Sequence, residues 1–228
     1  MPTTRTSLHV IATHVLGRRR FAVSGHFGLR ASPGGVATPA FGPEPEVVRT
    51  AGPDLIHEVG AASQSLVMDG ATLAELAALV GADLRAEFSA GAGAPAVGRL
   101  DEPMHLVDEE LDVLYGWFDL GSRALDVVTR GSGSVAGWST TQLWPEHFDV
   151  GTTLDLGSGQ GVNLGFSPGD GFSDAPYAYV GPWGPERPGP ADYWNAPFGA
   201  VLPQAGAEDV ETCSDFLRRG LALLGVTR

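Results

Sequence analysis

One stretch of the chain, residues 143–183, combines a clear strand pattern with clustered polar side chains that could do chemistry. His147 and Asp149 stand two positions apart, and Asp170 follows in the next predicted loop. Residues two apart on a strand share a face, so this imidazole and the first carboxylate would lie on one side. An imidazole and two carboxylates could bind a divalent metal ion or act as general acid and base. His147, Asp149 and Asp170 are therefore the candidate catalytic residues and the candidate metal ligands.

The same part of the chain is rich in aromatic residues, which could form the wall of a binding site. The candidate binding residues are Trp144, Asn163, Tyr177, Tyr179, Trp183 and Trp194. A purely structural role is the alternative: the histidine would bond a neighbour, the aspartates would stabilise turns, and the rings would fill the core. Both interpretations stay open at the level of the sequence.

A repeated alternation of apolar and polar residues predicts that these side chains lie on a β-hairpin. The alternation runs over residues 147–156 and again over residues 162–167, with the period of half-buried strands. The segment GSGQG between the two runs is flexible enough to reverse the chain. We expect Leu154 to lie opposite Leu164, because this register pairs apolar residues with apolar residues.

The segment LDLGSGQG, residues 154–161, resembles the glycine-rich first motif of S-adenosylmethionine-dependent methyltransferases. The resemblance implies a buried parallel strand that ends in a glycine turn against the cofactor. In that family the turn opens a helix, whereas residues 162–167 have the period of a strand and run into Pro168. Methyl transfer is therefore the last of three functional hypotheses.

Several segments occur in an order that resembles a bacterial domain family of unknown function. These segments are LWPEHFD, GFSPGD, PYAYV and FGAVLP, between residues 143 and 203. Members of the family carry a Leu-Trp-Pro-His-His-Phe-Asp segment, so Glu146 stands where they have a histidine. This departure weakens the case for a metal ligand at that position, and the resemblance implies no particular activity.

Periodicity and turn signals predict the elements that must position these side chains. The expected helices begin near Thr6, at the capping box of Thr72 and Glu75, at Asp108, and near Glu208. The expected strands cover residues 21–29, 36–41, 46–49, 55–59 and 65–68, in addition to the hairpin. We predict an α+β fold in which antiparallel sheets, built from hairpins and meanders, carry three to four helices packed on one side.

The first predicted helix ends at Gly17 and contains two histidines. His9 and His14 are five positions apart, so they would not share a helix face as an i,i+4 metal-binding pair would.

A small-residue segment, SAGAGAPAVG at residues 89–98, is the predicted boundary between two parts of the chain. Residues 1–88 would hold the first helix, a β-meander and a short helix. Residues 99–228 would hold the next helix, the LWPEHFD hairpin region and the last helix. We expect one compact domain of two sub-lobes joined by residues 89–98.

The composition restricts the class of partner. The formal net charge is −13, from 27 acidic and 14 basic residues, which argues against a nucleic acid. The chain has no apolar run of membrane-spanning length and no secretory signal at its start, so we expect a cytoplasmic protein without a membrane partner. The single cysteine, Cys213, excludes an internal disulfide. The sequence does not indicate an oligomeric state.

Two functions from different classes follow from these residues. The first is a non-enzymatic domain that binds a small molecule or a protein through the 143–198 region. The alternative is a metal-assisted hydrolase or isomerase that uses His147, Asp149 and Asp170. No cofactor is established by the sequence, and a divalent metal belongs to the second hypothesis alone.

Overall fold

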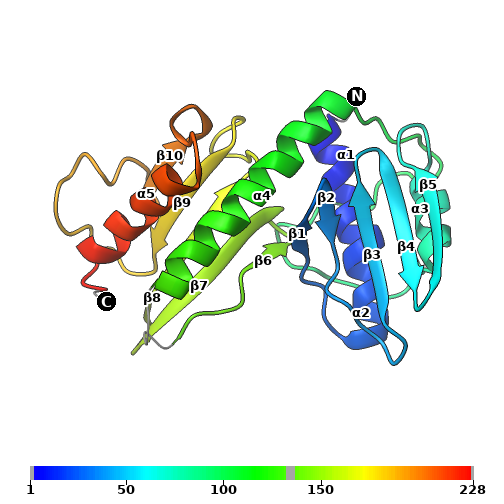
Figure 1. The fold of residues 1–228 in the computed structure, drawn as a ribbon, viewed down its shortest axis with the longest axis horizontal. Coiled ribbons are helices and arrows are strands. Elements are labelled where there is room, and N and C mark those ends of the chain that lie inside the picture. The colour runs from blue at the N-terminus through cyan, green and yellow to red at the C-terminus, as the bar shows by residue number, and fades with distance from the viewer. Residues whose placement is uncertain (1–2, 132–136, 227–228) are drawn as a thin grey trace. The chain divides into compact units, whose positions relative to one another are not determined.

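The computed structural model describes residues 3–131 and 137–226. In these ranges the chain forms two five-stranded antiparallel sheets, four helical segments and a short 3-10 helix (Gln204–Gly206), which confirms the predicted α+β class (Figure 1). The contacts divide the chain into unit 1, Met1–Gly116 with Leu143–Phe148, and unit 2, Trp117–Gln142 with Asp149–Arg228. Residues 89–98 therefore lie inside unit 1.

The first helix of unit 1 is longer than the sequence analysis expected. α1 (Thr4–Ile11), the π-helical segment η1 (Ala12–Gly17) and α2 (Arg18–Ser24) follow one another without a break. Gly25, with a φ of 73°, ends the helix, so a strand that begins at residue 21 is wrong. The helix continues because its three arginines reach acceptors on other segments of unit 1. These acceptors are the carbonyls of Asp83 and Ala86 for Arg18, the carboxylate of Glu46 for Arg19, and the carbonyl of Gly28 for Arg20.

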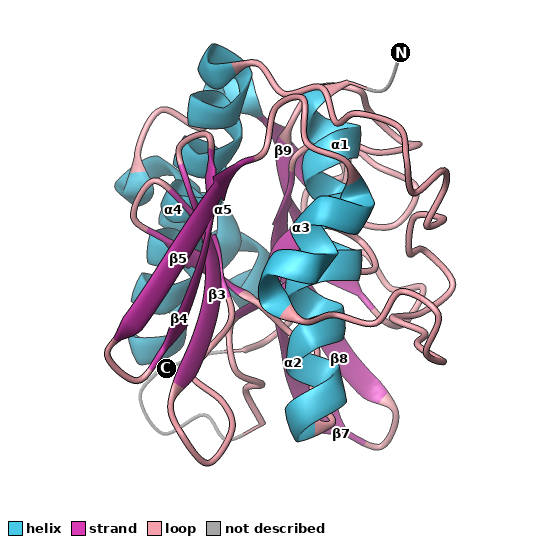
Figure 2. Ribbon diagram, turned by 90° about the vertical axis from the view of Figure 1, so that its right-hand side faces the viewer, coloured by secondary structure: helices cyan, strands magenta, loops and turns pink. Residues whose placement is uncertain are grey.

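The sheet of unit 1 is a simple meander in which each strand pairs with the next one along the chain. Its strands are β1 (Arg30–Ser32), β2 (Gly35–Ala37), β3 (Glu46–Ala51), β4 (Asp54–Val59) and β5 (Ala62–Val67). Figure 2 shows β3, β4 and β5 side by side. The predicted capping box is present at the start of α3 (Leu73–Val80), where Thr72 and Glu75 bond each other's backbone N–H.

The sheet of unit 2 contains the predicted hairpin with a tighter turn. Its strands are β7 (Asp149–Gly157), β8 (Gln160–Ser167), β9 (Tyr177–Pro182) and β10 (Ala200–Pro203), in the order β10-β9-β8-β7. The fifth strand in this order is β6 (Gln142–Trp144), of which Gln142 belongs to unit 2 and the other two residues to unit 1. Leu154 lies opposite Val162, so the expected register is wrong by two residues. Two features account for the shift: Ser158 and Gly159 form a two-residue turn with positive φ, as in a type I′ hairpin, and a β-bulge lies between Asp155 and Gly157.

Helices cover one face of the unit 2 sheet. The second part of α4 (Asp108–Gly131) lies along the sheet, where Trp117 Nε1 donates a 2.8 Å hydrogen bond to the carbonyl of Ser167 (Figure 1). On this helix Gly121 is required, because a Cβ there would lie 2.6 Å from the ring of Phe166. Strands β9 and β10 pack on α5 (Val210–Leu223). The residues buried on this face are Val150, Leu154, Val162, Leu164, Phe166 and Val180.

Candidate functional site

The other face of the unit 2 sheet carries the odd-numbered residues of β7, β8 and β9, and we call it the odd face. Its residues are Asp149, Gly151, Thr153, Asp155, Gly161, Asn163, Gly165, Ser167, Tyr177, Tyr179 and Gly181. Four predicted site residues therefore share one face, since Asp149, Asn163, Tyr177 and Tyr179 all occur in this set. The glycines leave room for the large side chains that lie across the strands.

Tyr179 crosses the sheet to reach a carboxylate two strands away. A Cβ on Gly165 of β8 would lie 2.5 Å from the Tyr179 ring, and one on Gly151 of β7 would lie 3.5 Å from its hydroxyl. The hydroxyl donates a hydrogen bond to Asp149. Burial, together with the negative charge of Asp149, raises the pKa of the Tyr179 hydroxyl well above its usual range. This phenol is therefore a donor to Asp149 and does not act as a base.

Tyr177 and Asp170 form a second hydroxyl–carboxylate pair. The Tyr177 hydroxyl donates to Asp170 Oδ2 at 2.6 Å, and the backbone N–H of Phe172 donates to Oδ1 at 2.8 Å. Burial alone would raise the pKa of Asp170, but these hydrogen bonds outweigh it and the pKa is lowered. Asp170 is therefore an ionised acceptor that fixes its own turn.

Two phenylalanines stand over the tyrosines and are partly exposed. The Phe172 ring meets Tyr177 edge to face at a centroid distance of 5.5 Å and Phe198 at 5.0 Å. Phe198 is also perpendicular to Tyr179, at 6.4 Å. Phe172 keeps 46% of its surface exposed and Phe198 keeps 36%, so both rings are accessible from solvent next to the two tyrosines.

Trp183, which follows β9, lies on the same face next to a second group of polar residues. A Cβ on Gly161 would lie 2.8 Å from its ring, and its Nε1 donates a 2.9 Å hydrogen bond to Asn163 Oδ1. Asp155 pairs with Gly161 in the sheet and is exposed, and Trp183 itself is 46% exposed. We define the aromatic patch as Phe172, Tyr177, Tyr179, Trp183 and Phe198.

His147 does not lie on the strand that the sequence analysis expected. β7 begins at Asp149, and residues 145–148 form a turn closed by a 2.7 Å hydrogen bond from Phe148 N–H to the carbonyl of Trp144. Phe148 has a φ of 57°, a left-handed conformation that the alternating pattern did not predict. His147 and Asp149 therefore do not share a strand face, and the predicted pairing is wrong. His147 is exposed and belongs to unit 1, whereas Asp149 and Asp170 belong to unit 2.

The two remaining predicted binding residues lie elsewhere. Trp144 is half-buried at the end of β6, in unit 1. Trp194 belongs to unit 2, where its Nε1 donates to the carbonyl of Pro188 at 2.8 Å and the Arg187 guanidinium stacks on its ring at 5.7 Å. Trp194 therefore stabilises the loop that contains it.

Two histidines of the first helix, His9 in α1 and His14 in η1, bond to carbonyls of other segments of unit 1. His9 Nε2 donates to the carbonyl of Pro145 at 2.6 Å, and His14 Nε2 donates to the carbonyl of Pro95 at 2.7 Å, because a carbonyl can only accept. Burial lowers the pKa of both, that of His9 to about 4, with neighbouring positive charges adding to the effect. Both imidazoles are therefore neutral near pH 7.

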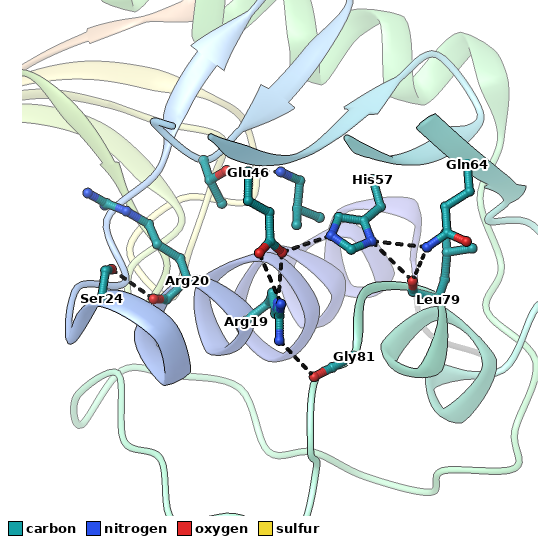
Figure 3. A network of polar contacts seen from close by, with 10 residues as sticks. Arg19, Arg20, Ser24, Glu46, His57, Gln64, Leu79 and Gly81 are labelled. Atoms are coloured by element: carbon teal, nitrogen blue, oxygen red, sulfur yellow. Dashed lines mark hydrogen bonds and ion pairs between the residues drawn. The ribbon is translucent and has the colours of Figure 1, made fainter. Parts of the chain in front are cut away.

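A buried charge network in unit 1 was also missed (Figure 3). Glu46 accepts two hydrogen bonds from Arg19, at 2.7 and 3.0 Å, and one from His57 Nε2 at 2.8 Å. Burial alone would raise the pKa of Glu46, but these bonds lower it. Gln64 Nε2 lies 3.1 Å from His57 Nδ1 and donates to the carbonyl of Leu79, so the network joins α2, the sheet and the end of α3. The sequence did contain a signal for this network, because Glu46 is a charged residue at an inward-facing position of β3.

No set of three His, Cys, Asp or Glu side chains is grouped as a metal site within residues 3–131 and 137–226. In the same ranges, no helix has both the length and the apolar character that crossing a membrane requires. Comparisons with protein-family models, with curated proteins and with solved structures found no match.

Proposed function

We propose that this protein is a non-enzymatic binding protein and that the aromatic patch on the odd face of unit 2 docks a partner protein. One observation carries the proposal. The exposed large hydrophobic residues of the described chain include three aromatic ones, Phe172, Trp183 and Phe198, and all three belong to this patch. Exposed aromatic rings gathered on one face are typical of protein interfaces, where they supply most of the binding free energy.

The hydrogen bonds of the two patch tyrosines favour a protein partner over a small molecule. Small-molecule sites rely on a few polar groups that point at the ligand and fix its orientation. Here the hydroxyl of Tyr179 is bonded to Asp149 and that of Tyr177 to Asp170. A protein can bury Phe172 and Phe198 without disturbing either pair.

The same pairing weighs against the metal-assisted hydrolase or isomerase, since Asp149 and Asp170 each accept a hydrogen bond from a neutral phenol. The glycine segment of the methyltransferase hypothesis joins two antiparallel strands, β7 and β8, and opens no helix. The cytoplasmic location expected from the sequence remains part of the proposal.

Site-specific photo-crosslinking in cells that make the protein tests the docking surface. A photoreactive phenylalanine analogue is placed at Phe172 or at Phe198, and the matched control carries it at Val127, which is 40% exposed on α4. We expect discrete light-dependent adducts from the two patch positions and none from the control. Adducts of equal yield at all three positions, or none at the patch in a folded protein, would contradict the proposal.

A further inference from the structure

The region around the odd face is strongly acidic. Residues 149–203 contain six acidic residues and one basic residue, Arg187. Arg187 is itself held in place, since it donates hydrogen bonds to the carbonyls of Gly184 and Phe198, at 2.8 and 3.1 Å, and stacks on Trp194. The exposed charges of this segment, among them Asp155 on the odd face, are therefore mainly negative and attract cations.

An exposed carboxylate lies next to an exposed indole on this face. Asp155 is the strand partner of Gly161, and the Trp183 ring lies over Gly161. Asp155 and Trp183 are both exposed, so a cation that lies on the Trp183 ring can also pair with the Asp155 carboxylate. Asp155 Oδ1 also accepts the N–H of Gly157 at 2.8 Å, which fixes the side chain near the start of the hairpin turn.

Aromatic rings attract arginine and lysine side chains through the negative potential of the ring face. Unit 2 already uses this contact internally, with Arg187 over Trp194 at 5.7 Å and Arg219 over Tyr193 at 5.0 Å. The exposed rings of the aromatic patch offer the same contact to another molecule.

We propose, on the basis of the docking function proposed above, that the partner presents a basic segment. Its arginine or lysine side chains lie on the exposed rings of the aromatic patch and pair with Asp155. A carboxylate beside a ring combines Coulomb attraction with the cation–π contact, so the face selects basic segments over acidic or purely apolar ones.

Titration of the full-length protein with four peptides of equal length, rich in arginine, lysine, glutamate or leucine, tests this selectivity. NMR spectra report on the backbone amides of residues 155–183 and on the indole N–H of Trp183. We expect the arginine peptide, and more weakly the lysine peptide, to shift these signals. Raising the salt concentration about tenfold should weaken the binding, because exposed charges are screened.

Two charge-matched variants separate the site from the general attraction of an acidic protein. Asp155→Asn removes the carboxylate beside Trp183, and Asn can still accept the Gly157 N–H. Asp101→Asn makes the same change in net charge at an exposed position of unit 1. We expect Asp155→Asn to raise the Kd for the arginine peptide about tenfold, equivalent to about 1.4 kcal/mol, and Asp101→Asn to leave it unchanged.

The outcomes distinguish the two proposals. Binding of the leucine or glutamate peptide at the same signals, or crosslinks at Phe172 without any effect of basic peptides, would overturn the basic partner and leave the docking surface standing. Equal effects of the Asp155 and Asp101 variants would also overturn it. Absence of patch-specific crosslinks together with absence of peptide binding would remove both proposals.

Discussion

Acid should destabilise unit 1 through His9, which is neutral and largely buried in the folded state. Its ring stacks on Phe148 at a centroid distance of 4.7 Å, and its Nε2 donates to the carbonyl of Pro145. Burial, and the nearby His14, His147 and Arg5, lower its pKa from 6.5 to about 4, although the bond to Pro145 acts in the opposite direction. Between about pH 4 and pH 6.5, His9 is therefore protonated in the unfolded chain and neutral in the folded chain.

The size of the effect follows from this difference in pKa. Above about pH 6.5 neither state is protonated and His9 contributes no pH dependence, whereas below that value the folded state loses stability as the pH falls. At about pH 4.5 the unfolded imidazole is almost fully protonated and the folded one mostly neutral, which costs about 2.5 kcal/mol in the free energy of unfolding.

Urea unfolding of the protein and of His9→Gln, at about pH 7 and about pH 4.5, measures the loss of stability that His9 causes on acidification. The variant cannot titrate and can still donate to Pro145, so the unmodified protein should lose about 2.5 kcal/mol more than the variant on acidification. The matched control is His26→Gln, at an exposed histidine of the same unit, which should follow the unmodified protein. Equal losses in the unmodified protein and in His9→Gln would refute the assignment of a buried neutral imidazole.

Two further variants test packing that the structure describes. Gly165→Ala should destabilise unit 2 by about 2 kcal/mol and displace Tyr179 from Asp149, because the new Cβ would lie 2.5 Å from the ring, whereas Gly171→Ala meets nothing within 4 Å and should change little. Unfolding curves and the NMR signals of Tyr179 check this, and an unchanged ring signal would contradict it. Glu46→Gln should cost about 2 kcal/mol in thermal or urea unfolding, because it weakens the Arg19 and His57 contacts of a buried carboxylate. The less buried pair of Arg49 and Glu58 provides the control, since Glu58→Gln should cost less than about 1 kcal/mol; similar losses in both variants would contradict a special role for the buried network.

The elements that the sequence predicted well are those whose signals are local. The capping box of Thr72 and Glu75 starts α3 at the expected residue, and the glycine turn near Ser158 joins β7 to β8. In each case a few adjacent residues determine the backbone conformation, so the pattern is sufficient. The register of the hairpin was missed because the pattern fixes which face each residue takes, and a shift of two residues preserves that face. Leu156 is the exception, since the β-bulge between Asp155 and Gly157 breaks the alternation and leaves it 43% exposed.

The parts that could not be predicted depend on partners far away in the sequence. Arg18, Arg19 and Arg20 look like a helix end, yet α2 continues because their acceptors come from other segments of unit 1. Phe148 adopts a left-handed conformation in a turn where its ring stacks on His9, and neither feature leaves a mark in the residues around it. This turn is what separates His147 from β7.

For the candidate site, the sequence predicted which residues share a face of the sheet but not which side chains contact one another. Alternation placed Asp149 and Asn163 on one side, and Tyr177 and Tyr179 lie on the same face of the sheet. The pairs themselves depend on how β9 aligns with β8, which puts Tyr179 opposite Gly165. The sequence did contain a signal for this contact, because Gly165 lies on the same face as the polar residues of β7. A large ring can lie across a sheet only where a glycine leaves room for it.

The division of the chain has a consequence for its synthesis. The polypeptide passes between the two units after Gly116, after Gln142 and after Phe148, so unit 1 is not a continuous segment. The carbonyl of Pro145 accepts hydrogen bonds from both His9 and Thr13, and Leu143 pairs with Leu29. A nascent chain that has emerged from the ribosome only as far as α4 therefore lacks the partner of its own first helix. Premature termination anywhere in residues 117–142 would leave unit 1 incomplete as well as removing unit 2.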